Sequence, residues 1–214
     1  MKRMVFWDLD LVLLRTKDLL LRIQEDLGTA VGQSPEAIFA AILAVDETGF
    51  SWRKLFEYIH LPPALWDEAE VFCFNHYETR TRDFVAAGVL EIVQHLASLG
   101  AEQHLVTFGQ ETFQREKWGR LHDFHPYFES QIYVGPGGSK GDAIAQRVAA
   151  EGGVVRSAFV DDSATWLRDA RTKVRATYRI RATWVTGYAP VEGDGTHWSV
   201  ARTPRDALAH ILST

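Results

Sequence analysis

Two carboxylate side chains directly follow the first apolar run of the chain. Asp8 and Asp10 lie one residue apart, immediately after residues 4–7, whose side chains are typical of a buried strand. In an open α/β sheet, ligands bind in the crevice outside the carboxyl ends of the strands. We therefore expect this pair at an edge of a sheet where chemistry can occur.

Three further apolar runs end in polar residues that could join the pair. They are residues 105–106 before Thr107, residues 132–134 before the glycine-rich turn that ends at Lys140, and residues 158–160 before Asp161 and Asp162. Parallel strands bring such ends to one edge of a sheet. Four carboxylates cannot all stay ionised there without a cation, and among these residues only Lys140 carries positive charge. Hard oxygen ligands with room for phosphate and water indicate Mg²⁺.

This ordered set resembles the haloacid dehalogenase-like (HAD) hydrolase superfamily. The four motifs are Phe6-Trp7-Asp8-Leu9-Asp10, Leu105-Val106-Thr107-Phe108-Gly109, Ser139-Lys140-Gly141-Asp142 and Phe159-Val160-Asp161-Asp162-Ser163. Each motif alone is weak evidence, but the four in order span nearly the whole chain. Leu11 departs from the pattern, because many members carry Gly directly after the second Asp. The departure raises the question of whether the turn after Asp10 is built in the same way.

The resemblance implies a Mg²⁺-dependent phosphomonoester hydrolase. Phosphoryl transfer needs a nucleophile, charge neutralisation and a proton donor. Asp8 is the expected nucleophile, forming an aspartyl-phosphate, and Asp10 the expected general acid and then base. The phosphate is expected to bind Thr107, Lys140 and backbone N–H groups around Phe108 and Gly109. The expected metal ligands are Asp8, the carbonyl of Asp10, and Asp161 or Asp162, with the choice within that last pair left open. Arg15, beside the first motif, is a candidate substrate contact.

The segment between the first two motifs has a different character from the rest of the chain. Helical periodicity within residues 17–81 predicts a compact helical insert. The resemblance implies that this insert, over residues 15–83, is an all-helical cap domain. Residues 1–14 and 84–214 then form the core, in which helices alternate with strands. The fold class is α/β, a Rossmann-like parallel sheet with helices on both faces. Further expected elements are helices over residues 88–99, 111–121, 140–150, 164–173 and 204–212, and a strand over residues 182–185.

Composition limits the class of protein. The chain has 214 residues, 46% of them hydrophobic, and a formal charge of −5. That charge argues against binding to duplex nucleic acid, which needs a concentrated positive surface. No membrane-spanning stretch is recognised. Cys73 is the only cysteine, so an intrachain disulfide is excluded and a reducing cytoplasm is the simplest location. The sequence gives no oligomeric state.

Three classes of function remain open at this point. A small phosphorylated metabolite is the favoured substrate, because a closing cap suits small molecules. Dehalogenases and phosphonate hydrolases of the same superfamily are less favoured, since their chemistry does not need Asp10 in this position. The second class is a phospho-relay receiver, in which the acidic pair comes first, the phosphorylated Asp follows a middle strand and there is no helical insert. The order of residues in this chain disagrees with that pattern. The third class is a catalytically silent binding protein with this fold.

Overall fold

A single parallel sheet forms the centre of the molecule. The computed structural model describes residues 2–46, 50–152, 155–186 and 198–213, and for residue 46 and residues 74–80 it describes the backbone alone. Within these ranges the sheet has six strands in the order β3-β2-β1-β4-β5-β6, and every neighbouring pair is parallel. The strands are β1 (Lys2–Trp7), β2 (Glu102–Phe108), β3 (Ser130–Val134), β4 (Val155–Asp161), β5 (Thr177–Ala182) and β6 (Ser199–Ala201).

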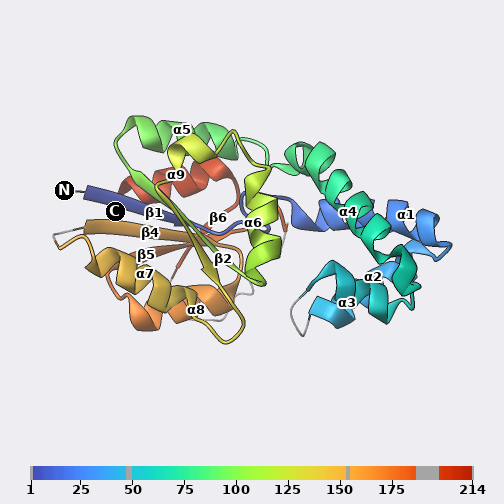
Figure 1. Ribbon diagram of the computed structural model, residues 1–214. Helices are drawn as coiled ribbons and strands as arrows, with labels where there is room; N and C mark the ends of the chain where they lie inside the picture. Colours follow the sequence, from blue (N-terminus) through green and yellow to red (C-terminus); the bar gives the residue numbers. More distant parts are fainter. Residues whose placement is uncertain (1, 47–49, 153–154, 187–197, 214) are drawn as a thin grey trace.

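Helices cover both faces of this sheet. Figure 1 shows α5 (Val89–Ser98) and α9 (Pro204–Ser213) on one face, and α7 (Lys140–Ala149) and α8 (Ala164–Lys173) on the other. Helix α6 (Glu111–Gly119) contacts β2 and β3. The predicted three-layer Rossmann-like core is therefore confirmed, and these five helices lie within three residues of their expected bounds.

Strand β1 is buried on both faces, as its continuous apolar run predicts. Val5 and Trp7 belong to the cluster that includes residues of α5 and α9, whereas Met4 and Phe6 belong to the cluster that includes residues of α7 and α8. Successive side chains of a strand point to opposite faces, so one strand serves both clusters. Fully burying each such side chain contributes about 1.5–3 kcal/mol. The residue that follows this strand, Asp8, is thereby held at a firm position.

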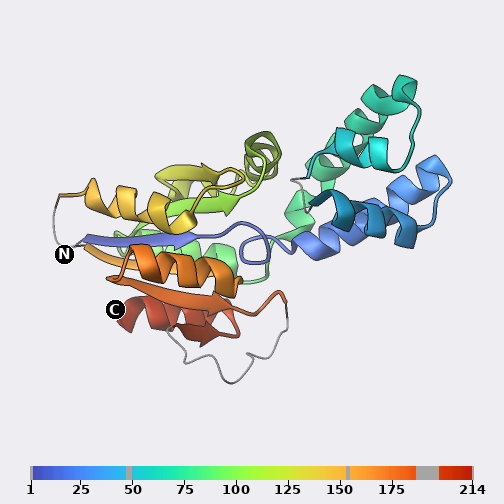
Figure 2. The same cartoon turned by 90° about the horizontal axis from the view of Figure 1, so that it is seen from below.

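The segment between β1 and β2 contains four further α-helices that lie to one side of the sheet (Figures 1 and 2). They are α1 (Thr16–Val31), α2 (Pro35–Asp46), α3 (Trp52–Tyr58) and α4 (Trp66–Arg80), with short 3-10 helices η1 (Pro63–Leu65), η2 (Thr81–Phe84) and, in the core, η3 (His125–Tyr127). Gly32, in the left-handed conformation, ends α1, and the side chain of Ser51 caps α3 by accepting from the Lys54 N–H. These two residues therefore fix where α1 ends and where α3 begins.

The chain enters and leaves this helical segment at one place. The Arg15 N–H donates to the Phe84 carbonyl over 2.7 Å, and the Ala86 N–H donates to the Leu13 carbonyl over 2.9 Å. Leu14 and Val85 form an antiparallel bridge between these hydrogen bonds. The two connectors therefore run side by side as a short ladder.

The predicted strand over residues 182–185 is wrong. The strand is β5, Thr177–Ala182, and residues 183–186 form a turn in which the Trp184 indole donates to the Val12 carbonyl over 2.9 Å. Arg179 and Arg181 alternate along β5 with the buried Ile180 and Ala182, which weakens its apolar signal. The sequence analysis also missed β6, since a three-residue edge strand leaves almost no periodicity to read.

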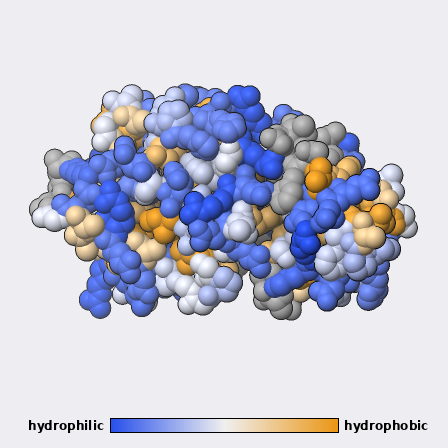
Figure 3. Space-filling model, viewed as in Figure 1, coloured by the Kyte–Doolittle hydropathy of each residue, from blue (hydrophilic) through white to orange (hydrophobic). Residues whose placement is uncertain are grey.

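The outer surface is largely polar in the view of Figure 1. Figure 3 shows mostly hydrophilic residues on this face, with small and separated apolar patches. Among the described residues, no single helix is long and apolar enough to cross a bilayer, although the bent pair Thr16–Val31 and Pro35–Val45 passes the same test of length and composition together.

Candidate active site

Three aspartates from two neighbouring strands meet at the carboxyl edge of the sheet. Strands β1 and β4 pair in parallel with Trp7 opposite Val160, so Asp8 and Asp161 follow side by side. One carboxylate oxygen from each of Asp8, Asp161 and Asp162 lies within 4.8 Å of the other two. Strand β1 has β2 on one side and β4 on the other, so this point is where the strand order reverses, the usual ligand position in such sheets.

Lys140 places its ammonium group between two of these carboxylates. Its side chain is 1% exposed, and its Nζ lies 2.7 Å from Asp8 Oδ1 and 2.8 Å from Asp161 Oδ2. The residue opens α7, whose N-cap Ser139 accepts from the Asp142 N–H over 2.9 Å. Gly141 lets α7 approach α8, because a Cβ there would lie 2.8 Å from the Asp169 carbonyl oxygen. The glycine therefore serves helix packing next to the lysine.

The site carries more negative charge than one lysine can balance. Burial raises the pKa of Asp8; Lys140 opposes this shift, while the charges of Asp161 and Asp10 add to it. Burial, and next the charge of Asp8, raises the pKa of Asp162 to about 6. Crowded carboxylates of this kind favour a bound cation, and oxygen donors are the ligands that Mg²⁺ prefers. The residues present thus fit the divalent ion that the sequence predicts.

The two oxygens of Asp8 differ in their surroundings. Oδ1 accepts from the Leu9 N–H over 2.8 Å and lies 2.7 Å from the Lys140 ammonium. Among the described residues, no hydrogen bond to Oδ2 is found. A carboxylate with one oxygen held and the other free is pre-oriented for attack through the free oxygen.

Asp10 lies in a separate network of donors. Lys117 Nζ lies 2.6 Å from both of its carboxylate oxygens, Thr16 donates its hydroxyl over 2.5 Å, and the Gln114 amide donates over 3.3 Å. Burial alone would raise the pKa of Asp10, but the charge and hydrogen bonds of Lys117, with those of Thr16 and Gln114, lower it below its usual range. Asp10 is therefore held as a carboxylate in this arrangement.

Thr107 connects to this network through Gln114. Its hydroxyl donates to the Gln114 Oε1 over 3.0 Å, and the Gln114 amide also donates to the Phe108 carbonyl over 3.0 Å. The Gly109 N–H donates to the Val134 carbonyl over 3.0 Å, so it continues the sheet. Two of the groups expected to bind phosphate, the Thr107 hydroxyl and the Gly109 N–H, are thus already used as donors. Gly109 has a φ of 137°, and a Cβ there would lie 2.8 Å from the Gln114 amide nitrogen.

The backbone of Leu11 shows how the turn after Asp10 is built. Its φ is 60°, in the left-handed region that favours glycine. The turn after Asp10 is therefore built with the backbone that a glycine would adopt, and the leucine carries the strain. Its N–H donates to the Leu14 carbonyl over 2.8 Å, which closes the turn.

Arg15 lies at the connectors, and its contacts are with the other connector and with the first turn of α1. Its guanidinium pairs with Asp18 at 2.7 Å, donates to the Asp83 carbonyl over 2.8 Å and lies 5.6 Å from the centre of the Phe84 ring. No contact between Arg15 and the four aspartates of the site is found among the described residues. Its position indicates a structural contact between the two connectors.

Sequence reasoning missed Thr16, Gln114 and Lys117. Gln114 and Lys117 are three residues apart on α6 and both buried, so they lie on one face of the helix. Polar residues beside the apolar Phe113 and Trp118, in the helix that follows the second motif, were a readable signal.

Comparison with known proteins supports the fold by structure alone. No family model matches the chain, and no curated protein matches its sequence. A haloacid dehalogenase-like family hydrolase from Xanthomonas campestris is 16% identical with a TM-score of 0.66, covering 99% of this chain and 91% of its own. A protein from Thermotoga maritima with the provisional name beta-phosphoglucomutase is 17% identical with a TM-score of 0.68, covering 100% of both chains. A predicted phosphatase from Clostridium acetobutylicum is 13% identical with a TM-score of 0.61, again covering 100% of both.

The chain has the fold of the haloacid dehalogenase-like hydrolases. Within this fold, the residues of the four ordered motifs lie at the carboxyl edge of the sheet. The resemblance inferred from the sequence is therefore confirmed at the level of the fold.

Proposed function

We propose that the protein is a Mg²⁺-dependent phosphomonoester hydrolase that acts on a small phosphorylated metabolite through an aspartyl-phosphate on Asp8. The observation that carries this proposal is the meeting of Asp8, Asp161 and Asp162 within 4.8 Å, with the Lys140 ammonium between two of them. A phosphate monoester is shielded by its own anionic oxygens, so a carboxylate can attack it only where positive charge is concentrated.

In the proposed first step, Asp8 Oδ2 attacks phosphorus, a bond forms between them, and the bond to the leaving oxygen breaks. Asp10 gives its proton to that oxygen, and the alcohol departs. In the second step, Asp10 takes a proton from water, whose oxygen attacks phosphorus and releases Asp8 and inorganic phosphate. The Lys140 ammonium balances charge on the transferred group. A bound Mg²⁺ supplies the remaining positive charge and orients the phosphate.

Asp10 must carry a proton before it can donate one. In this structure Lys117 holds it ionised, with the ammonium 2.6 Å from both oxygens. We propose that substrate binding separates or weakens this pair, after which burial favours the protonated form of Asp10. The lysine would then return to Asp10 when the product leaves.

Asp161 and Asp162, the acidic pair of the fourth motif, have different roles in this proposal. Asp161 Oδ1 accepts from the Ser163 N–H over 2.8 Å and Oδ2 from Lys140 over 2.8 Å, so both of its oxygens are held by protein donors. A carboxylate oxygen of Asp162 lies within 4.8 Å of one from Asp8. We therefore propose Asp162 as the direct metal ligand, with Asp8 and the Asp10 carbonyl, and Asp161 as the residue that positions Lys140.

We propose that residues 15–83 act as a cap domain over a core of residues 1–14 and 84–214. The paired connectors at Leu13–Arg15 and Phe84–Ala86 support these boundaries. On the core side, Phe113 of α6 lies 4.9 Å from the ring of Phe50 and 6.0 Å from the ring of Trp52. A cap that reaches the helix carrying Lys117 can exclude water from the site, which favours small substrates.

A cytoplasmic location is part of the proposal. Cys73 is buried, and burial raises its pKa to about 12, so the thiol is poorly suited to redox chemistry. An uncharged structural thiol is compatible with a reducing compartment. We propose no partner besides the small substrate, and neither duplex nucleic acid nor a membrane.

Hydrolysis of p-nitrophenyl phosphate by the purified chain tests the proposed function. Turnover is expected with Mg²⁺, its loss in EDTA, and its absence in Asp8→Asn. Turnover of the Asp8→Asn variant at the wild-type rate, in a preparation shown free of other phosphatases, would refute the nucleophile. Absence of turnover across a panel of phosphorylated metabolites, with Mg²⁺ still bound, would favour a catalytically silent binding protein. Release of halide or of phosphonate-derived phosphate would favour the other hydrolases of this fold.

A further inference from the structure

A glutamine side chain on α6 joins the first two motifs. Gln114 is buried, and its Oε1 accepts from the Thr107 hydroxyl over 3.0 Å. Its amide nitrogen donates to the Phe108 carbonyl over 3.0 Å and to Asp10 Oδ2 over 3.3 Å. One amide group therefore connects the end of β2 with the carboxylate that we propose as acid and base.

The orientation of this amide group follows from its partners. The Phe108 carbonyl and the ionised Asp10 carboxylate can only accept hydrogen bonds, so the amide nitrogen has to face them. Turning the amide over would place its oxygen against two other acceptors, and a buried acceptor without a donor is costly. Gln114 therefore presents a fixed donor to Asp10.

Gly109 leaves the space that the glutamine side chain fills. A Cβ at this position would lie 2.8 Å from the Gln114 amide nitrogen and 3.5 Å from its Cγ. The glycine of the second motif and the glutamine are thus matched in shape. Filling this space is a role that any unbranched side chain of similar length can perform, so shape alone does not require an amide.

Gln114 differs from the other donor on the same face of α6, because it carries no charge. Lys117 lies 2.6 Å from both oxygens of Asp10, and in the proposed reaction this ion pair has to weaken before Asp10 can donate a proton. An amide N–H donates to a carboxylate and equally to the carbonyl oxygen of a carboxylic acid. Gln114 can therefore hold Asp10 through both steps of the reaction, which Lys117 cannot.

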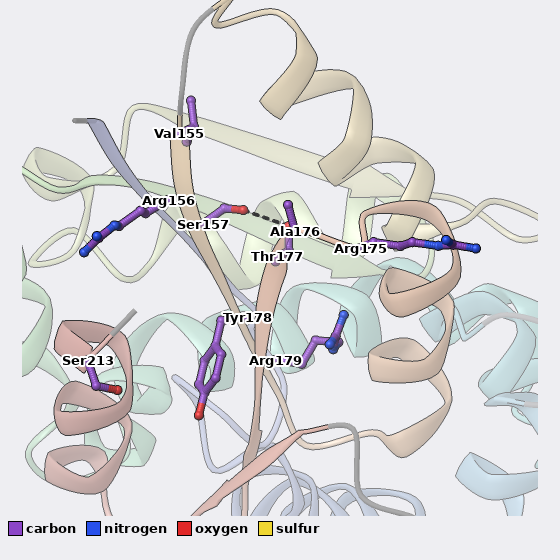
Figure 4. A pocket seen from close by; sticks show the side chains of 9 residues that line it. All are labelled: Val155, Arg156, Ser157, Arg175, Ala176, Thr177, Tyr178, Arg179 and Ser213. Carbon is purple, nitrogen blue, oxygen red and sulfur yellow. Dashed lines mark hydrogen bonds between the residues drawn. The ribbon is translucent and has the colours of Figure 1, made fainter.

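Buried hydrogen bonds also occur away from the site, so burial alone does not assign a role. Figure 4 shows Ser157 and Thr177 near the starts of β4 and β5, beside a surface hollow of about 410 Å³, with their hydroxyls 2.8 Å apart. Gln103, near the start of β2, accepts from the Trp7 indole over 3.1 Å and donates to a backbone carbonyl of α5 over 2.9 Å. The partners of Gln114 differ, because they include a proposed reacting group.

We propose that Gln114 is a positioning residue, which holds Asp10 where its carboxyl group meets the leaving oxygen. This inference rests on the proposed function, since it assigns Gln114 to the acid and base of that reaction. Gln114 acts through Asp10 and does not touch the reacting atoms. Misplacing a catalytic group by about 1 Å can lower a rate by about a hundredfold, so the loss of this contact is measurable.

Two aryl phosphates that differ in their leaving group test this role. The p-nitrophenolate ion leaves without a proton, whereas phenolate is a poorer leaving group and depends more on the acid. The value of kcat/KM, measured on the full chain with Mg²⁺, reports the step in which the leaving group departs. Gln114→Met should lower kcat/KM about tenfold to a hundredfold for phenyl phosphate, and less than about threefold for p-nitrophenyl phosphate. A general loss of structure would lower both values alike.

Gln103→Met is the matched control, because it also removes a buried glutamine amide. It lies four residues before Thr107 on β2, roughly 13 Å away along the strand. The ratio of its two kcat/KM values should stay within about twofold of the parent. Gln114→Glu keeps the side-chain length and the acceptor for Thr107, but as a carboxylate it offers Asp10 no donor. It should change the ratio as Gln114→Met does, and it tests the proposal if Gln114→Met fails to fold in a melting experiment.

The outcomes separate this inference from the proposed function. If the ratio in the folded variants of Gln114 equals that of Gln103→Met, the side chain at this position only fills space, and the proposal is overturned. An equal loss for both esters in those variants also overturns it. A parent that hydrolyses neither ester refutes the proposed function, and this inference with it.

Discussion

The Lys117–Asp10 pair predicts a large and unusual stability effect for Lys117→Met. The lysine side chain is 3% exposed, and that of Asp10 is 27% exposed. Methionine keeps most of the volume but removes the ammonium, which leaves a mostly buried carboxylate without its cation. The expected result is a clear loss of stability, and its cause is the remaining charge on Asp10.

The magnitude follows from what Asp10 retains. Breaking a buried ion pair by removing one partner costs roughly 3–5 kcal/mol. Asp10 keeps the hydroxyl of Thr16 and the amide of Gln114 and has partial access to water, so we expect about 2–3 kcal/mol. For a chain of this size, each kcal/mol shifts the melting temperature by about 2–4 °C, which gives a decrease of about 4–12 °C.

Urea unfolding in EDTA at pH 7 measures this loss without metal binding. Arg115→Gln is the control on the same helix. Arg115 pairs with Glu111 at the surface and lies 4.4 Å from the centre of the Tyr133 ring, so its loss should cost no more than about 1 kcal/mol. The variant with both Lys117→Met and Asp10→Asn removes both charges. It should be more stable than Lys117→Met alone, because no charge is then left buried.

The pH dependence has a definite sign. The pKa of Asp10 is lower in the folded state than its unfolded value of about 3.9, so the pair stabilises the fold above that value and the effect is lost as the pH falls through the folded pKa. The difference between wild type and Lys117→Met should therefore shrink as the pH falls below about 4. Strict additivity in the double variant, or a difference that grows in acid, would refute the reasoning.

Three further predictions concern single residues. Asp10→Asn should lower kcat by a factor of about 10²–10⁴. It should leave the calorimetric Kd for Mg²⁺ within about twofold, because only the backbone carbonyl of residue 10 is expected to contact the ion. A large change in this Kd with kcat unchanged would contradict the acid–base role of Asp10. Burial, and next the charge of Arg147, lowers the pKa of His104 from 6.5 to about 4, so the free energy of unfolding should fall by about 2–3 kcal/mol as the pH falls from 6.5 to 4. The free energy of unfolding of His104→Asn should not show this dependence on pH, and an identical dependence would contradict the assignment. Leu11→Gly should be more stable than Leu11→Ala by about 1 kcal/mol, because only the alanine keeps a Cβ at φ 60°; equal melting temperatures would show that the turn is unstrained.

Much of the fold was readable because several signals agreed. The run at residues 4–7 is apolar at every position, and such a run predicts a strand buried on both faces, as β1 is. Helix α8 was predicted with its observed bounds, Ala164–Lys173. Strand β5 was misplaced because its arginines interrupt the apolar pattern. The better apolar run at residues 182–185 starts at the last residue of β5 and continues into a packed turn.

The sequence predicted the positions of site residues only where the backbone of the sheet determines them. Residues at the ends of parallel strands must lie at one edge, and this rule alone brings Asp8, Asp161 and Asp162 together. The contact between Lys117 and Asp10 depends on how α6 is rotated against β2, which the motif does not fix.

The hydrogen-bonded connectors make the helical segment a replaceable module. Its first and last residues lie next to each other, so a different stretch of chain can be spliced between Leu14 and Phe84 without moving any strand of the sheet. The residues proposed for chemistry lie almost entirely outside the exchanged stretch, with Thr16 the exception. If the segment is the cap that we propose, selection can alter which molecules are admitted while the proposed reacting groups stay as they are.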